Sequence, residues 1–386
     1  MPMKTSESKR DFLKKSLTLG LGLPLIGSSV WSCSEQKNEL KPLNILILGG
    51  TSFLGPHQVA FAISRGHKVS TFTRGKTQPT VHKEVFDQVE MLVGDRQDNL
   101  TALENREWDV VIDNSGRAAD WTRDSATLLK DKVGQYIYIS STGVYYPHET
   151  ADVDEDFPVL MEDPLNENGE APERDSFGVM KAKSEQEAYK VFGEERTTIV
   201  RPTYMLGPAD RTERSIYWPM RLNKGGEVMV PGKEDDPVQY IDVRDVAEFV
   251  IRLAENKTPG TYNAVGPFDA QGMHDFIKMA SKAFPSEKEF IYIDDYDFLK
   301  EQNLLFIIPW IIPTDEYAAS ARVKNGRAIG AGLGFRDLKT TMVDVLEWWN
   351  SEAVTEERRQ KFLDSPQNAM NREAELLEAW KTHSEA

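Results

Sequence analysis

A short apolar run followed at once by a glycine-rich segment is the feature that most narrows the fold of this chain. Residues 44–48 are Asn-Ile-Leu-Ile-Leu, and the segment 49–55, Gly-Gly-Thr-Ser-Phe-Leu-Gly, leads into an amphipathic stretch that ends near Arg65. Such an apolar run is typical of a strand that is covered on both faces of a sheet. A glycine-rich turn from this strand into a helix aims backbone N–H groups at an anion, and the helix dipole adds to the attraction. The pattern therefore predicts a dinucleotide-binding unit.

We expect the whole turn to contact the dinucleotide. In this interpretation Gly49 permits a tight turn, Gly50 lets the backbone approach the pyrophosphate, and Gly55 lets the helix pack closely on the strand. The predicted contacts are Gly49, Gly50, Thr51, Ser52, Phe53, Leu54 and Gly55.

Apolar runs and amphipathic stretches alternate after this turn, which is the pattern of repeated βαβ units in a parallel sheet. The fold class predicted is α/β: a Rossmann-type doubly wound parallel sheet with a smaller, interleaved C-terminal substrate domain. Besides 44–48, we expect strands over residues 68–73, 90–93, 109–113, 136–139 and 198–201, and a helix that starts near Phe177.

The predicted domain boundaries follow from changes in composition. We expect an export signal over 1–33, a tether over 34–42, the NAD(P)-binding domain over 43–202, the substrate domain over 203–351 with segments that return to the sheet, and a charged helical tail over 352–386. For that tail, a solvated helix is the favoured interpretation.

Composition excludes several classes of function. The chain has 46 Lys and Arg against 62 Asp and Glu, a net charge of -16, so nucleic acid is not an expected partner. A single cysteine excludes a disulfide framework, and the six histidines show no ligand spacing, so no metal site is predicted.

The end of the second predicted strand bears on the choice of cofactor. An acidic residue there would bind the ribose 2′-hydroxyl, whereas arginine favours a 2′-phosphate. Here the chain has Arg74 and no acid, so NADP is slightly favoured over NAD. After the third strand, Asp95 is placed to contact the adenine side.

Several further motifs resemble one known group of proteins. They are the glycine turn, Gly94-Asp95-Arg96, Ser140-Ser141-Thr142-Gly143-Val144-Tyr145, Phe177-Gly178-Val179-Met180-Lys181-Ala182, Arg201-Pro202 and Ile241-Asp242-Val243-Arg244-Asp245. With these residues the chain resembles the extended or atypical short-chain dehydrogenase/reductase superfamily, the NAD-dependent epimerase/dehydratase group. Within it, the stretches 66–75 and 210–218 are most similar to a subgroup that includes chloroplast stem-loop RNA-binding proteins.

The resemblance implies a catalytic set of a serine or threonine, a tyrosine and a lysine. Ser141, with Thr142 beside it, matches the hydroxyl that polarises the substrate oxygen, and Lys181 matches the lysine, which also contacts the nicotinamide ribose. The ammonium lowers the pKa of the tyrosine, which then exchanges a proton with the substrate. In this chain Phe177 stands at the tyrosine position, and a phenyl ring exchanges no proton.

Three interpretations of Phe177 stay open. Another group could take the proton, and Tyr145 or Tyr146 are the nearest candidates in sequence. The protein could bind its cofactor without turnover, or a water molecule or a group of the substrate could act instead.

Residues beyond the sixth strand combine cations with aromatic rings, as suits an anionic or sugar ligand. The predicted substrate contacts are Tyr204, Arg211, Arg214 and Trp218. A polar loop that packs its aromatic residues into the domain junction is the alternative.

The N-terminal segment predicts export. Residues 8–14 resemble a twin-arginine signal with Lys9 in place of the first arginine, and an uncharged run from Ser16 to Trp31 follows. The run ends at Cys33, which resembles a lipoprotein processing site, so we expect a periplasmic or cell-envelope protein, with lipid anchoring at Cys33 and an incidental cysteine as the two alternatives.

Export restricts the chemistry, because free nicotinamide cofactor is not expected outside the cytoplasm. We therefore predict a redox-neutral NAD(P)-dependent enzyme of the epimerase/dehydratase type, with a carbohydrate or polyol as its small-molecule substrate. A non-catalytic NAD(P)- or ligand-binding protein of the same fold is the alternative, and RNA binding is disfavoured by the acidic charge.

Overall fold

A computed structural model describes residues 41–114, 117–166, 168–366 and 368–385. Residues 1–40, and with them the predicted export signal and Cys33, lie outside the described residues. Among the described residues, no helix is both long and apolar enough to cross a membrane. Residues from Lys41 onward form one compact unit.

A seven-stranded parallel sheet forms the centre of the first half of this unit. Its order is β10-β6-β5-β4-β1-β2-β3, so the chain runs outward from β1 in both directions, as in a doubly wound fold. The strands are β1 (Asn44–Leu48), β2 (Lys68–Thr73), β3 (Glu90–Val93), β4 (Trp108–Asp113), β5 (Val133–Ile139), β6 (Thr197–Pro202) and β10 (Gly260–Ala264). The predicted fold class is confirmed, and each predicted strand lies within an observed one.

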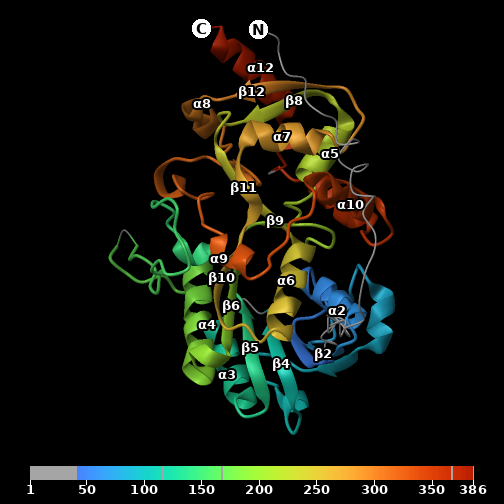
Figure 1. Ribbon diagram of the computed structural model, residues 1–386. Coiled ribbons are helices and arrows are strands. Elements are labelled where there is room, and N and C mark those ends of the chain that lie inside the picture. Colours follow the sequence, from blue (N-terminus) through green and yellow to red (C-terminus); the bar gives the residue numbers. More distant parts are fainter. Residues whose placement is uncertain (1–40, 115–116, 167, 367, 386) are drawn as a thin grey trace, which may run out of the picture. The chain divides into compact units, whose positions relative to one another are not determined.

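Helices cover both faces of the sheet, which explains the continuous apolar runs of its strands (Figure 1). On one face, α2 (Leu54–Ser64) and α6 (Val243–Glu255) pack on the side chains of Ile45 and Ile47. On the other, α3 (Ala119–Leu129) and α4 (Phe177–Phe192) lie over Leu46 and Leu48. Alternate residues of β1 thus enter two separate cores, as the period of a strand requires.

A second lobe lies beyond the carboxyl ends of the parallel strands (Figure 1). Its sheets are small: β11-β9-β7, the parallel pair β12-β8 and the hairpin β13-β14. Its strands are β7 (Met205–Leu206), β8 (Gly226–Pro231), β9 (Pro237–Asp242), β11 (Gly266–Gly272), β12 (Lys288–Ile293), β13 (Phe306–Ile307) and β14 (Trp310–Ile311). Its helices are α5 (Tyr217–Lys224), α7 (Met273–Ser281), α8 (Tyr296–Glu301), α9 (Gly326–Gly330), α10 (Leu338–Asn350), α11 (Glu356–Leu363) and α12 (Glu373–Ser384). Between β9 and β11, α6 and β10 return to the large sheet.

The charged tail is helical, and its helix α11 is mostly exposed, whereas α12 is anchored in the second lobe. The carboxylate of Glu373 is buried and accepts hydrogen bonds from the Arg221 guanidinium, at 2.7 Å, and from the Met229 N–H, at 3.0 Å. Leu376 is buried in the core of the second lobe. The tail therefore completes that lobe.

Candidate functional site

The glycine turn has the geometry of a phosphate-binding site. Gly49 has a φ of +90°, and its N–H donates to the Phe72 carbonyl on β2 at 3.0 Å. A Cβ atom on Gly55 would lie 2.5 Å from the Gly50 carbonyl carbon and 2.6 Å from the Gly49 oxygen, so only glycine lets α2 start this close to the strand. No side chain caps the N-terminus of α2, although the Gly55 N–H donates to the Ser52 carbonyl at 3.1 Å. A helix N-terminus without a side-chain cap suits an anion.

The lack of a side chain at Gly50 is explained by its close packing on the neighbouring strand β2. A Cβ atom there would lie 2.4 Å from the Thr71 methyl group on β2, so its lack of a side chain lets the turn approach that strand. Gly50 is buried and does not line the cleft described below, and its approach to pyrophosphate stays a prediction.

The turn opens into a cleft of about 920 Å³ between the large sheet and the second lobe. Most of the predicted site residues meet there. Those that line the cleft are Gly49, Thr51, Ser52, Phe53, Leu54, Arg74, Asp95, Ser141, Thr142, Phe177, Lys181, Tyr204, Arg211 and Arg214.

Close packing brings Phe177 next to Ser141. A Cβ atom on Gly178 would lie 2.2 Å from the Gly143 carbonyl oxygen, so α4 starts in direct contact with the turn that carries the serine. A Cβ atom on Gly143 would lie 3.3 Å from the Ser141 Oγ and 3.5 Å from the Phe177 ring. Phe177 is 57% exposed and lines the cleft.

Lys181 lies one helical turn farther into the sheet. Its ammonium donates to the Ile139 carbonyl at 2.7 Å and lies 5.8 Å from the centre of the Phe177 ring. Burial lowers the pKa of Lys181 to about 8, and the charges of Asp113 and Glu185 oppose that shift. The ammonium is thus held at the carboxyl end of β5, and Lys181 lines the same cleft as Ser141.

Tyr145 does not enter the cleft, so the structure corrects its predicted catalytic role. Its hydroxyl donates to Asn263 Oδ1 at 2.9 Å and accepts from Arg201 at 2.6 Å. Arg201 in turn forms a buried ion pair with Glu185 at 2.6 Å. Tyr145 is therefore part of a buried polar network behind the site.

Its neighbour Tyr146 does line the cleft, together with Tyr317 from the second lobe. The ring centroids of the two tyrosines are 5.8 Å apart. Partial burial and a hydrogen bond with Tyr317 raise the pKa of Tyr146 to about 12, so its phenol is protonated at neutral pH.

The structure also overturns the predicted substrate contact of Trp218. Its side chain is 1% exposed and packs edge-on against Tyr217 and Phe276, with ring centroids 5.0 and 6.2 Å away. It does not line the cleft, because α5 turns this face into the core of the second lobe.

The two predicted arginines extend from a loop that one carboxylate organises. Asp210, which is 1% exposed, accepts from the N–H and hydroxyl of Thr212 at 2.8 and 2.7 Å, and from those of Ser215 at 3.0 and 2.8 Å. Arg214 lies over the Tyr204 ring, 5.6 Å from its centre. We call residues 207–215 the arginine loop.

The cleft is basic although the chain as a whole is acidic. Asp95 is the single carboxylate among the described residues that line it. Within the described part of the chain, no ion pair neutralises Arg74, Lys76, Arg211 or Arg214. The cleft therefore suits a ligand with several negative charges.

Sequence reasoning missed one pair of residues beside this cleft. His57 on α2 and His82 are 25 residues apart, yet their rings are joined by a hydrogen bond of 3.0 Å. No sequence spacing indicates this contact, since it depends on how the loop after β2 returns to α2.

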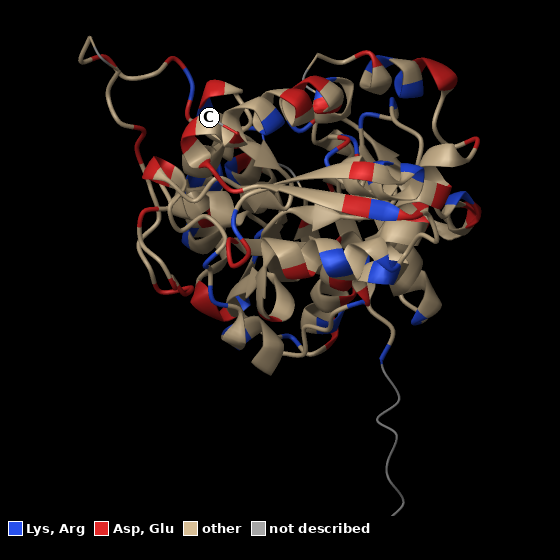
Figure 2. Ribbon diagram, turned by 90° about the horizontal axis from the view of Figure 1, so that it is seen from above, with Lys and Arg blue, Asp and Glu red and all other residues tan. Residues whose placement is uncertain are grey.

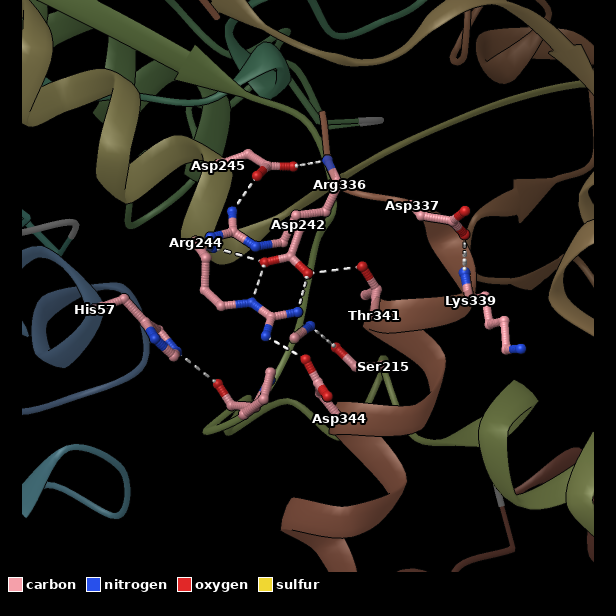
Figure 3. A network of polar contacts seen from close by, with 12 residues as sticks. His57, Ser215, Asp242, Arg244, Asp245, Arg336, Asp337, Lys339, Thr341 and Asp344 are labelled. Atoms are coloured by element: carbon pink, nitrogen blue, oxygen red, sulfur yellow. Dashed lines mark hydrogen bonds and ion pairs between the residues drawn. The ribbon is translucent and has the colours of Figure 1, made fainter. Parts of the chain in front are cut away.

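An ion-pair network lies next to the arginine loop and joins α6 to α10 (Figure 3). Asp242 caps the first turn of α6 by accepting from the Arg244 N–H at 2.8 Å, and it also accepts from the Thr341 hydroxyl on α10 at 2.7 Å. Arg244 further binds Asp344 of α10. Asp242 is thus the N-cap of α6, which starts at Val243.

Together, the uncapped helix, the glycine turn and the basic cleft define a Rossmann-type nucleotide-binding protein. The chain belongs to the NAD dependent epimerase/dehydratase family, whose model matches residues 45–265.

Solved structures share this fold. The enzyme WbmH of Bordetella bronchiseptica, solved in complex with NAD+, matches with a TM-score of 0.58 and 17% identity over 81% of this chain and 100% of that one. UDP-glucuronic acid 4-epimerase of Bacillus cereus, in complex with NAD, has a TM-score of 0.56 and 16% identity over 81% of this chain and 100% of its own.

Among curated proteins, the chloroplast stem-loop binding protein of 41 kDa b from Arabidopsis thaliana is 29% identical over 243 residues. The match spans 60% of this chain and 58% of that protein. In the ribbon view of Figure 2, acidic and basic residues are interspersed along the chain.

Proposed function

We propose that this protein binds NAD(P) in the cleft, with the diphosphate on the glycine turn. The observation that carries the proposal is that the glycine turn, Ser141 and Lys181 line one continuous cleft. The chain fits the cofactor, because α2 has no side-chain cap and Gly55 lets this helix start directly against the backbone of Gly49 and Gly50. Arg74 at the end of β2 supports NADP over NAD.

We propose redox-neutral chemistry on a carbohydrate or polyol. The nicotinamide would supply a hydride acceptor and donor. The Ser141 hydroxyl would donate a hydrogen bond to the reacting substrate oxygen, and the Lys181 ammonium would stabilise negative charge that develops nearby. The unpaired Arg211 and Arg214 support an anionic substrate, in line with the UDP-glucuronic acid named for the relative from Bacillus cereus.

The proton must move without the usual tyrosine. Of the two tyrosines that follow the Ser141 strand, Tyr146 lines the cleft and Tyr145 does not. A phenol with a pKa of about 12 holds its proton at neutral pH. It suits the second half of the cycle, in which the hydride returns and the substrate oxygen takes up a proton, whereas the first half releases the proton of the substrate hydroxyl to a water molecule or a group of the substrate, and that proton later restores the phenol. We therefore assign to Tyr146 the donation of the proton in the return step.

A direct test is to purify the full chain, denature it and identify any released dinucleotide by chromatography. Retained NAD(P), or a melting temperature that rises on adding NADP+ or NAD+, would support the proposal. The Arg74→Ala variant should lose affinity for NADP+ and keep its affinity for NAD+. Nucleotide sugars are then supplied, and isomerised or dehydrated products are sought by chromatography, with Ser141→Ala as the inactive control.

A cofactor-binding protein without turnover is the second candidate, and the phenyl ring of Phe177 beside Ser141 favours it. Dinucleotide binding with no product from any nucleotide sugar would support this alternative. A protein that binds no dinucleotide would refute both candidates.

We also propose that the chain is exported by its N-terminal signal, with Cys33 as the candidate site of a lipid anchor. An exported protein suits a closed hydride cycle, because it needs no external supply of cofactor. Cell fractionation of the intact chain and of a Cys33→Ala variant tests this. A cytoplasmic location of both would overturn export, and an unchanged membrane fraction in the variant would overturn the anchor.

A further inference from the structure

The hydrogen bonds of the His57–His82 pair have a defined direction. The second ring nitrogen of His57, Nε2, lies 3.1 Å from the carbonyl oxygen of Pro208. A carbonyl only accepts, so His57 Nε2 carries the proton and donates. Its Nδ1 must then accept, at 3.0 Å, from the Nε2–H of His82. The chain of donors thus runs from His82 through His57 to Pro208.

This chain of hydrogen bonds joins three segments with different tasks. His57 is in the first turn of α2, the helix that follows the predicted diphosphate-binding turn. His82 ends the loop that follows Arg74 and Lys76, and Pro208 belongs to the arginine loop. Val81 supports the contact by packing in one apolar cluster with Ala209 and Ile216.

Both rings are neutral at physiological pH. Burial lowers the pKa of His57 to about 4, with His82 and Arg244 adding to the effect and Asp242 opposing it. Burial likewise lowers the pKa of His82, with Glu84 opposing and Arg244 adding. A neutral His57 has one donor and one acceptor, and both are used here.

We propose that His57 is a positioning residue, which holds the arginine loop against the dinucleotide-binding helix so that Arg211 and Arg214 form one anion site for the substrate. Asp210 fixes the inside of the loop, but its partners all belong to the loop itself or to α11, since Arg358 donates to its carbonyl oxygen at 2.5 Å. The His57 bond to Pro208 links the loop to the helix that binds the cofactor (Figure 3). This inference rests on the proposed function.

The test measures sulfate binding to the full chain saturated with NADP+. Sulfate stands in for the anionic group of the substrate, and the bound dinucleotide keeps it from the glycine turn. An Arg211→Met variant assigns the signal, because it should lose sulfate binding at this site.

Two substitutions at His57 separate positioning from mere packing. Leucine offers neither donor nor acceptor, so His57→Leu should weaken sulfate binding about tenfold, as loss of a buried hydrogen bond and a looser loop imply. Glutamine has one donor and one acceptor, so His57→Gln should stay within about threefold of the wild type. The matched control is His274→Leu, which removes another histidine bonded to a carbonyl, that of Gly232 at 3.3 Å, and should change nothing.

The affinity for NADP+ decides what a loss of sulfate binding means. The proposal requires His57→Leu to change this affinity less than about twofold. It is overturned if sulfate binding is unaffected in His57→Leu, if glutamine is as harmful as leucine, or if both ligands weaken equally. If the wild type binds no dinucleotide, the proposed function fails, and sulfate titration of the free protein with Arg211→Met still decides whether the arginine loop binds anions.

If His57→Leu does not fold, a second measurement on the wild-type protein tests the proposal. Nitrogen-15 NMR of the wild-type histidine rings should show His57 as the Nε2–H tautomer, and its signal should shift on adding sulfate. Arg211→Met should abolish that shift. A His57 ring that carries its proton on Nδ1, or a His57 signal that does not shift on adding sulfate, would overturn the proposal.

Discussion

Acid should destabilise this protein through His57. Its pKa falls from an ordinary value of 6.5 to about 4 in the folded chain, because burial penalises the charged ring. Between these two values the unfolded chain binds a proton that the folded chain does not bind. Stability therefore rises with pH across this window, and it is lost as the pH falls from 6.5 towards 4.

The size of the effect follows from the shift. One pKa unit corresponds to about 1.4 kcal/mol, so His57 alone removes about 2.5 kcal/mol of the free energy of unfolding between about pH 7.5 and about pH 4.5. For a domain whose total stability is about 5–15 kcal/mol, this is a large fraction.

Urea denaturation at a series of pH values measures it, with His57→Gln as the reference. The buried His148, whose pKa burial also lowers to about 4, contributes to both proteins and cancels. Wild type should lose about 2.5 kcal/mol more than the variant over this range. Parallel losses in the two proteins would refute the reasoning, since they would mean that His57 is protonated in the folded state or exposed to solvent.

Three further predictions concern the site and its support. Tyr146→Phe should lower turnover of a substrate about 10²-fold or more with NADP+ binding unchanged, and adding Phe177→Tyr should restore activity; an unaffected rate would remove Tyr146 from the mechanism. Gly55→Ala should weaken dinucleotide binding about tenfold to a hundredfold in a calorimetric titration, because the new methyl group meets backbone atoms at 2.5 Å, and wild-type affinity would contradict the assigned role of the turn. Arg201→Met should cost about 3–5 kcal/mol in urea unfolding by leaving the buried Glu185 unpaired, and a second change, Glu185→Leu, should recover part of it; a loss below about 1 kcal/mol would show that water reaches the pair.

The sheet could be predicted from sequence because its signals are local. A strand covered on both faces is largely apolar, so residues 44–48 and 136–139 are marked by composition alone. At β5 the prediction began at Tyr136, three residues late, because Gly134 and Gln135 interrupt the apolar run while the backbone still pairs with β4. The glycine turn was equally visible, since its chemistry depends on consecutive residues.

The predictions failed where the direction of a side chain, or a contact between residues far apart in the sequence, determines the position of a residue. Tyr145 and Tyr146 adjoin a 3₁₀ turn, in which successive side chains point about 120° apart, so one enters the cleft and the other the core. Composition shows no such difference. His57 and His82 meet only because the loop after β2 folds back, and the partner of Arg221 lies 152 residues away at Glu373.

Because Glu373 is so far along the chain from Arg221, it determines when the second lobe can complete its folding during synthesis. Arg221 is buried on α5, and its charge stays uncompensated until the segment that carries Glu373 has been synthesised. A growing chain that has emerged only as far as α10 thus holds a guanidinium that the interior disfavours, and it should keep this part of the lobe open. Nascent chains arrested before and after residue 373 should differ sharply in their resistance to protease, because one late helix closes the structure.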